Sequence, residues 1–180
     1  MKKKLLAALA GTIASAALLI GGVRIYNYIE QSIPLETVMT EQYGERMIDF
    51  ELPDMAGNSI QVTASSGKPK LINFWASWCP GCKSEAEDLN HIYSKYKEEI
   101  DIISVNVTTE DSVEEAQAFL EAYDVQMPTL LDREGIVSAQ YRITAIPTNF
   151  FVRADGTIGQ ITYELTKSRA EPFIQELLGQ

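Results

Sequence analysis

Two cysteines, Cys79 and Cys82, are the residues of this chain with the most distinctive chemistry. They are its only cysteines, and they stand three positions apart in the segment 75–83, which reads WASWCPGCK. A disulfide between them closes too small a loop to restrict the unfolded chain much, so redox chemistry explains the pair better than stapling. Thiol-disulfide exchange needs one thiolate that attacks and a second thiol that resolves the mixed disulfide.

The elements around the pair assign these two roles. An apolar run at 70–75 predicts a strand buried on both faces, and from Cys79 to about Lys97 apolar residues recur every three or four positions, as in an amphipathic helix. Backbone amides at a helix N-terminus stabilise a thiolate, so we predict that Cys79 is the nucleophile. Cys82, one helical turn further on, is predicted to be less exposed and to act as the resolving thiol.

Glu85 lies three residues after Cys82, on the same face of the predicted helix. A carboxyl group on a partly apolar face tends to have a raised pKa and can exchange protons near neutral pH. We hypothesise that Glu85 accepts the proton of Cys82 during resolution. The residues alone leave open the alternative of a solvated helix glutamate beside Glu87 and Asp88.

The rest of the chain alternates strand and helix patterns. Two pairs of short strands are separated by turn residues, at 49–52 with 59–63 and at 147–152 with 157–163. The other predicted elements are strands at 100–107 and 128–131 and helices at 112–123, 136–141 and 167–178. This order predicts an α/β fold whose mixed central sheet is flanked by helices on both faces, with an extra N-terminal β-hairpin.

The N-terminus follows a membrane pattern. Three lysines at 2–4 precede an uncharged run of 19 residues at 5–23, which is close to the ~20 residues that a membrane-crossing helix needs. The lysines should stay inside, with the remainder exported. A cleaved signal peptide is the competing reading, but the small-residue triplet at 14–16 lies within the run. We expect a signal-anchor helix at 1–23, a spacer at 24–46 and the domain at 47–180.

The net charge and the small number of possible metal ligands argue against nucleic-acid-binding and metal-binding proteins. From residue 31 onward 11 Lys and Arg oppose 24 Asp and Glu, a net charge of -13, which repels nucleic acid. Two cysteines and the single histidine, His91, fall short of the four ligands that zinc usually takes. Lys83 follows Cys82 where a haem-attachment motif has histidine. We therefore expect neither metal nor cofactor.

The segment 73–83, NFWASWCPGCK, resembles the active-site segment of thioredoxins. The stretches FELPD at 50–54, with Gly57, and VRADGTI at 152–158 resemble the two hairpins of the membrane-anchored TlpA/ResA-like branch. The likeness extends from about 47 to 178. It implies a thioredoxin-like fold and a thiol-disulfide oxidoreductase.

This resemblance also implies roles for single residues. It places a cis Pro147 opposite the cysteines, whereas only ~5–6% of X-Pro bonds in folded proteins are cis. Ile146 and Thr148 then offer backbone to an extended substrate segment, and Trp78 and Pro80 are further substrate-contact candidates. ResA-like members carry a glutamate three residues after the second cysteine, in agreement with Glu85.

Two positions depart from the thioredoxin pattern. Asn73 stands where ordinary thioredoxins have a buried aspartate, which leaves Glu85 as the natural proton carrier. The Pro80-Gly81 pair reverses the Gly-Pro of thioredoxins, so a redox potential cannot be transferred from them.

The resemblance implies a reductase of protein disulfides, such as apocytochrome c in cytochrome c maturation, recharged by a membrane electron donor. The protein would sit in the bacterial cell membrane with its catalytic domain on the extracytoplasmic side. A peroxiredoxin-like peroxidase shares this fold, but Ser77-Trp78-Cys79 does not supply the Thr-x-x-Cys arrangement. A CxxC metal-binding module and a non-catalytic membrane adaptor are the remaining alternatives.

Overall fold

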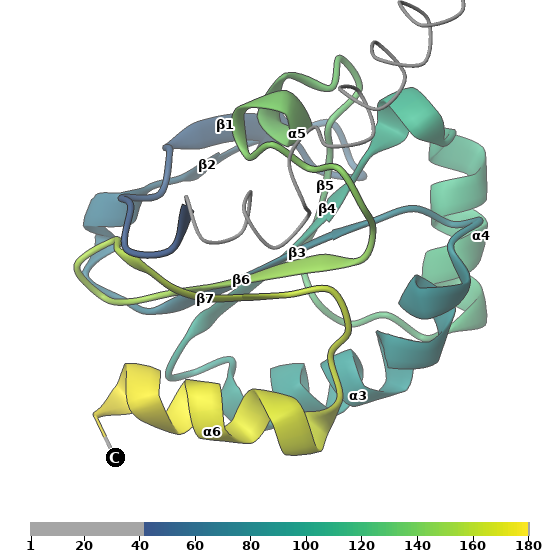
Figure 1. Ribbon diagram of the computed structural model, residues 1–180. Helices are drawn as coiled ribbons and strands as arrows, with labels where there is room; N and C mark the ends of the chain where they lie inside the picture. Colours follow the sequence, from purple (N-terminus) through teal and green to yellow (C-terminus); the bar gives the residue numbers. More distant parts are fainter. Residues whose placement is uncertain (1–41, 180) are drawn as a thin grey trace, which may run out of the picture. The chain divides into compact units, whose positions relative to one another are not determined.

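The apolar run at 70–75 forms β3 (Lys70–Trp75), whose six residues are all buried at the centre of a five-stranded sheet. The structure is a computed structural model that describes residues 42–179. The strand order is β5-β4-β3-β6-β7, and β3 pairs in parallel with β4 and antiparallel with β6 (Figure 1). The other strands of this sheet are β4 (Asp101–Asn106), β5 (Thr129–Leu131), β6 (Thr148–Val152) and β7 (Ile158–Thr162).

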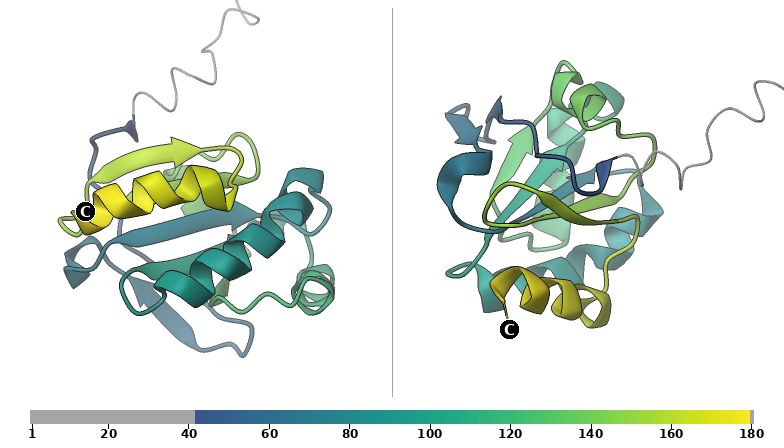
Figure 2. Two further views of the ribbon diagram at one scale, coloured as in Figure 1. Left: turned by 90° about the horizontal axis from the view of Figure 1, so that it is seen from below. Right: turned by 60° about the vertical axis from the view of Figure 1, so that its left-hand side comes forward.

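Helices cover this sheet as the sequence pattern predicts. The helices of the described residues are α3 (Pro80–Tyr96), α4 (Val113–Ala122), α5 (Ile136–Gln140) and α6 (Lys167–Leu178). Two of them, α3 and α6, lie side by side across one face, where Leu71 and Phe151 of the sheet pack against Ile92 and Ile174 (Figure 2). The opposite face carries α5 and the N-terminal hairpin (Figure 1). The predicted thioredoxin-like α/β fold is confirmed, with element ends within one or two residues of those expected.

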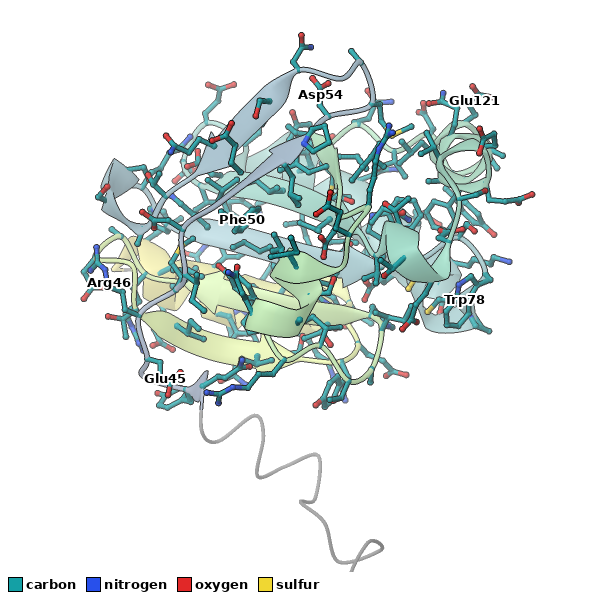
Figure 3. All side chains as sticks on the ribbon, turned by 90° about the horizontal axis from the view of Figure 1, so that it is seen from above. Glu45, Arg46, Phe50, Asp54, Trp78 and Glu121 are labelled. Carbon is teal, nitrogen blue, oxygen red and sulfur yellow. The ribbon has the colours of Figure 1, made fainter. Side chains whose placement is uncertain are left out.

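The N-terminal hairpin is a two-stranded sheet of its own. Its strands, β1 (Phe50–Pro53) and β2 (Ser59–Val62), pair antiparallel with Phe50 opposite Val62. Asp54 organises the turn, since its Oδ1 accepts the backbone N–H groups of Ala56 and Asn58, both at 2.8 Å. Figure 3 shows Phe50 and Asp54 on this hairpin, above the sheet. Phe50 is buried in the core between the two layers, so the hairpin closes one face of the sheet.

Residues just before the hairpin cover the free edge of β7. The Gly44 N–H donates to the Ile158 carbonyl at 2.9 Å, and the Ile158 N–H donates to the Glu45 carbonyl at 2.8 Å. Arg46 forms an isolated antiparallel bridge with Thr157. These contacts occupy an edge that would otherwise be open to another chain.

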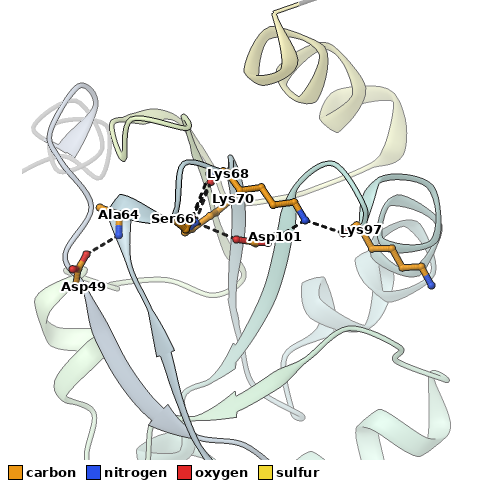
Figure 4. A network of polar contacts seen from close by, with 7 residues as sticks. All are labelled: Asp49, Ala64, Ser66, Lys68, Lys70, Lys97 and Asp101. Carbon is orange, nitrogen blue, oxygen red and sulfur yellow. Dashed lines mark hydrogen bonds and ion pairs between the residues drawn. The ribbon is translucent and has the colours of Figure 1, made fainter.

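A polar network fixes the start of the central strand, at the end of β3 away from the cysteines. The buried Lys70 ammonium contacts the Ser66 hydroxyl, the Lys68 carbonyl at 3.0 Å and Asp101 Oδ2 at 3.2 Å (Figure 4). Lys68 adds an ion pair with Asp101 at 3.3 Å. A buried charge is tolerated only when paired and hydrogen-bonded, and these partners also hold the first residues of β3 and β4 in register.

The predicted signal anchor at 1–23 lies outside the described residues, as does the predicted spacer up to residue 41. Within 42–179, no helix has both the length and the apolar character needed to cross a membrane.

Candidate active site

Cys79 is the N-cap residue of α3, directly after the turn that leaves β3. Its sulfur accepts the Cys82 backbone N–H at 3.2 Å, which is the capping contact of this helix. Pro80 follows at the first helical position, where its missing N–H removes no helical hydrogen bond. The Cys79 sulfur therefore lies at the positive end of the helix dipole, as expected for the nucleophile.

Both cysteines are free thiols, and both are buried, Cys79 to 2% and Cys82 to 3% relative exposure. The prediction that Cys82 is the less exposed of the two is wrong. The reason is tertiary: Ile146 packs against the cysteine cluster, and the Cys79 thiol lies 3.4 Å from the Ile146 carbonyl, to which it donates. The two thiols differ instead in their hydrogen bonds, since Cys79 caps the helix.

The Ile146-Pro147 peptide bond is cis, as the family resemblance implies. Pro147 lies against the cysteine loop so closely that a Cβ on Gly81 would be 2.9 Å from the Pro147 Cδ and 3.9 Å from the Cys79 sulfur. A side chain at position 81 of this chain would therefore have to displace Pro147.

Replacing Gly81 with alanine is expected to lower the free energy of unfolding by about 1–3 kcal/mol, because the new methyl group overlaps a buried ring. The exchange rate should fall as well, since Pro147 must move away from Cys79. Urea denaturation and an insulin-reduction assay measure the two effects. Ser84→Ala, on the exposed side of the same helical turn, is the matched control. Equal stability of the two variants would contradict the close contact.

Glu85 is a buried residue, at 3% exposure, and is not the solvated glutamate of the alternative interpretation. Its Oε1 accepts the Asn73 side-chain amide at 2.8 Å; its Oε2 accepts the Leu165 backbone N–H at 3.0 Å and the Asn149 amide at 3.3 Å. Burial raises the pKa of Glu85 from its ordinary 4.5 to about 7, against the lowering effect of these three donors. A carboxyl group with this pKa can both take up and release a proton near neutral pH.

Cys82 is held in its protonated form. Burial, followed by the contact with the Cys79 sulfur, raises the pKa of the Cys82 thiol far above its ordinary value, and the nearby Glu85 charge adds to this. A thiol in this state attacks a disulfide only after a base has removed its proton. Glu85 lies one turn further along the same buried helix face.

Trp78, the residue before Cys79, borders a cavity of about 440 Å³. Its side chain is 52% exposed, at the rim of the molecule in Figure 3, and its indole N–H donates to the Glu110 carbonyl at 2.7 Å. Ile146 lines the same cavity, whereas Thr148 is buried at the start of β6. The structure thus brings Trp78 and Ile146 to one surface next to Cys79, with Pro147 behind Gly81.

Three groups at the site escape sequence reasoning. Asn149 reaches Glu85 because the sheet register places it opposite Asn73, and the Leu165 N–H reaches Glu85 from the segment between β7 and α6. Asp111 accepts the backbone N–H and the hydroxyl of Ser77, each at 2.6 Å, and so ties down the loop before Cys79. No local pattern marks these contacts, although an asparagine two residues after Pro147 in a predicted buried strand is a weak signal.

Within residues 42–179, no group of three or more His, Cys, Asp and Glu side chains is arranged to hold a metal ion. His91 is exposed on α3.

Comparison with known proteins agrees with this geometry. A family model described as AhpC/TSA family matches residues 43–161. The chain belongs to the AhpC/TSA thioredoxin-like family. Thioredoxin-like protein YneN of Bacillus subtilis (strain 168) is 32% identical over 121 residues, 67% of this chain and 71% of YneN. Thiol-disulfide oxidoreductase ResA of Bacillus thuringiensis subsp. konkukian (strain 97-27) is 30% identical over 138 residues, 76% of this chain and 79% of ResA.

A solved structure supports the same family assignment. A crystal structure of a Chlorobium tepidum protein described as thiol:disulfide interchange protein DsbE superposes with a TM-score of 0.69 at 25% identity, covering 76% of this chain and 98% of that one. This family member is a thiol-disulfide oxidoreductase of the ResA/DsbE kind, with Cys79 and Cys82 as its CxxC pair. The family implies protein thiols as substrates.

Proposed function

We propose that this protein reduces disulfide bonds of protein substrates on the extracytoplasmic side of a bacterial membrane, with Cys79 as nucleophile, Cys82 as resolving thiol and Glu85 as proton acceptor. The observation that carries the proposal is the buried Glu85 carboxyl group, whose pKa is raised to about 7, one helical turn from a thiol that is itself held protonated. A carboxylate with a pKa near 7 is a stronger base than an ordinary glutamate, so it can accept the Cys82 proton as this sulfur attacks.

The reaction has two steps. The Cys79 thiolate attacks one sulfur of the substrate disulfide, forms a mixed disulfide and releases the other substrate sulfur as a thiolate. The Cys82 proton then passes to the Glu85 carboxylate, and the Cys82 sulfur attacks the Cys79 sulfur. The bond from Cys79 to the substrate breaks, the second substrate thiolate leaves, and the protein holds a Cys79–Cys82 disulfide.

The substrate segment would lie along the surface formed by Trp78, Pro80, Ile146, Pro147 and Thr148. The cavity beside Trp78 supports this proposal, because it is lined both by Trp78, which precedes Cys79, and by Ile146, whose carbonyl contacts the Cys79 thiol. The backbone around a cis proline offers hydrogen bonds that depend little on substrate sequence, while the cavity can select one side chain of the substrate.

The reducing direction is supported by the protonated state of the Cys82 thiol. An oxidant such as DsbA is strong because its reduced form is stabilised. Here burial, the contact with the Cys79 sulfur and the Glu85 charge all raise the pKa of Cys82. A raised pKa disfavours the Cys82 thiolate and hence the oxidant role.

The membrane setting is supported by the N-terminal sequence. A signal anchor at 1–23 would hold the domain at 47–180 outside the cell, through a spacer at 24–46 whose residues from Gln42 onward already contact the domain. A thiol-reducing donor in the same membrane would return the disulfide to the dithiol. Since a 30% identical relative is a ResA protein, apocytochrome c is the substrate that we would test first.

The reduction potential tests the direction. We expect the full-length protein in detergent, equilibrated with glutathione or dithiothreitol buffers, to show a potential near thioredoxin's ~-270 mV or lower. A value near ~-120 mV would make the protein an oxidant and overturn the proposal. Peroxide turnover in a parallel assay would favour the peroxidase alternative.

A further inference from the structure

The Glu85 carboxyl group is surrounded by hydrogen-bond donors. Asn73 Nδ2 lies 2.8 Å from Oε1, while the Leu165 N–H and Asn149 Nδ2 lie 3.0 and 3.3 Å from Oε2. Within residues 42–179, these three partners of the carboxyl group are all donors. A carboxylate can accept all three bonds, whereas a protonated carboxyl group must turn its O–H toward one of these donors or find another partner.

Asn73 and Asn149 also hold one another. They are register partners across the antiparallel pair of β3 and β6, and both are buried. Asn73 Nδ2 uses its second hydrogen to donate to Asn149 Oδ1 at 2.9 Å. Flipping either side-chain amide, so that its nitrogen and oxygen exchange places, would bring two amino groups or two oxygens into contact. The pair therefore cannot offer an acceptor to Glu85 without losing one of its own hydrogen bonds.

We propose that Asn73 and Asn149 are positioning residues for the proton transfer: each binds one oxygen of the Glu85 carboxylate, and together they disfavour its protonated form. This inference rests on the proposed role of Glu85 as proton acceptor. Burial alone would keep a proton on Glu85 throughout the neutral range. The hydrogen bonds from the two asparagines oppose this effect, because they stabilise the carboxylate. With the pair in place, Glu85 takes the Cys82 proton and can release it again.

The other groups near Glu85 do not replace this pair. Cys82, on the same helix, is the proton donor of the proposed step. Glu164, in the segment before α6, is a like charge that raises the pKa of Glu85, and it contacts Arg169 at 3.7 Å. Among the described neighbours of the carboxylate, the donors that lower its pKa are therefore the two asparagines and the Leu165 N–H.

The test is a pH titration of the Glu85 side-chain carboxyl by carbon-13 NMR in the reduced full-length protein. Asn149→Leu and Asn73→Leu keep the approximate volume and remove one donor each. A hydrogen bond to a charged group has a strength equivalent to about one pH unit or more, so the titration midpoint should move upward by about one unit in each variant.

The rate of mixed-disulfide resolution provides a second readout. An upward move of one unit from about 7 leaves about a fifth as much Glu85 carboxylate at pH 7, so resolution there should slow about fivefold and recover at alkaline pH. A merely structural defect would slow resolution equally at every pH. Should either leucine variant fail to fold, Asn73→Asp keeps the shape, replaces the donor by a carboxylate, and should move the midpoint upward too.

Thr129→Val is the matched control, because Thr129 is a buried polar residue of the same sheet whose hydroxyl binds only the Met127 carbonyl among the described residues. It should leave the midpoint unchanged. Midpoints within about 0.3 pH unit of the wild type in both asparagine variants, or an equal move in Thr129→Val, would overturn the inference. Glu85→Gln separates the two proposals: unchanged resolution in that variant removes the role of Glu85, whereas the NMR titration still reports on the asparagines.

Discussion

The Cys79→Ser variant is expected to lose disulfide exchange, with a fall in rate on the order of a thousandfold or more. The hydroxyl group that replaces the thiol is not ionised at neutral pH and cannot form the mixed disulfide. Cys82→Ser should behave differently, because Cys79 can still attack but nothing resolves the product. A stable adduct with a protein substrate, detected by mass spectrometry and released by dithiothreitol, is the expected result.

The two serine variants are controls for one another, since both sites are buried and both changes replace sulfur by oxygen. Equal stability in urea would show that the difference between them is chemical. If Cys79→Ser formed the stable adduct and Cys82→Ser did not, the two roles would be reversed. If both variants kept full activity, the interpretation as a non-catalytic membrane adaptor would replace that of a thiol-disulfide oxidoreductase.

The Glu85→Gln variant is expected to lack the part of the pH dependence of stability that comes from titration of Glu85. The folded-state pKa of Glu85 is raised from 4.5 to about 7, so between these values the folded protein binds more protons than the unfolded one. Stability from this group is therefore greatest at low pH and falls as the pH rises through about 7, by about 3 kcal/mol in total. Glutamine does not titrate, so the difference in unfolding free energy between wild type and variant should change by that amount.

Urea denaturation at several pH values between about 4 and 9 measures this difference. Glu87→Gln, an exposed glutamate two residues further along α3, is the matched control and should follow the wild type. The same Glu85→Gln protein should resolve mixed disulfides slowly near neutral pH, since Cys82 has lost its proton acceptor. A stability difference that does not vary with pH would mean that folding leaves the pKa of Glu85 unchanged, contrary to its burial.

The nucleophile and its strand-turn-helix setting could be read from the sequence because the relevant signals are local. An apolar run, a CxxC spacing and a helical period are all complete within residues 70–97. The order of strands and helices followed for the same reason, with ends displaced by only one or two residues. The cis bond before Pro147 came from family resemblance alone, because base rates favour the trans form.

What surrounds Glu85 was decided by pairing between distant segments. The sequence places Glu85 on the helix face of Cys82, but it cannot show that β3 and β6 align Asn73 with Asn149, or that the N–H of Leu165 reaches the carboxyl group. The near-equal burial of the two cysteines has the same origin, since Ile146 packs against them from 67 residues beyond Cys79. Local periodicity assigns a side chain to a face, whereas the pKa of a buried acid depends on each donor and on each layer that excludes water from it.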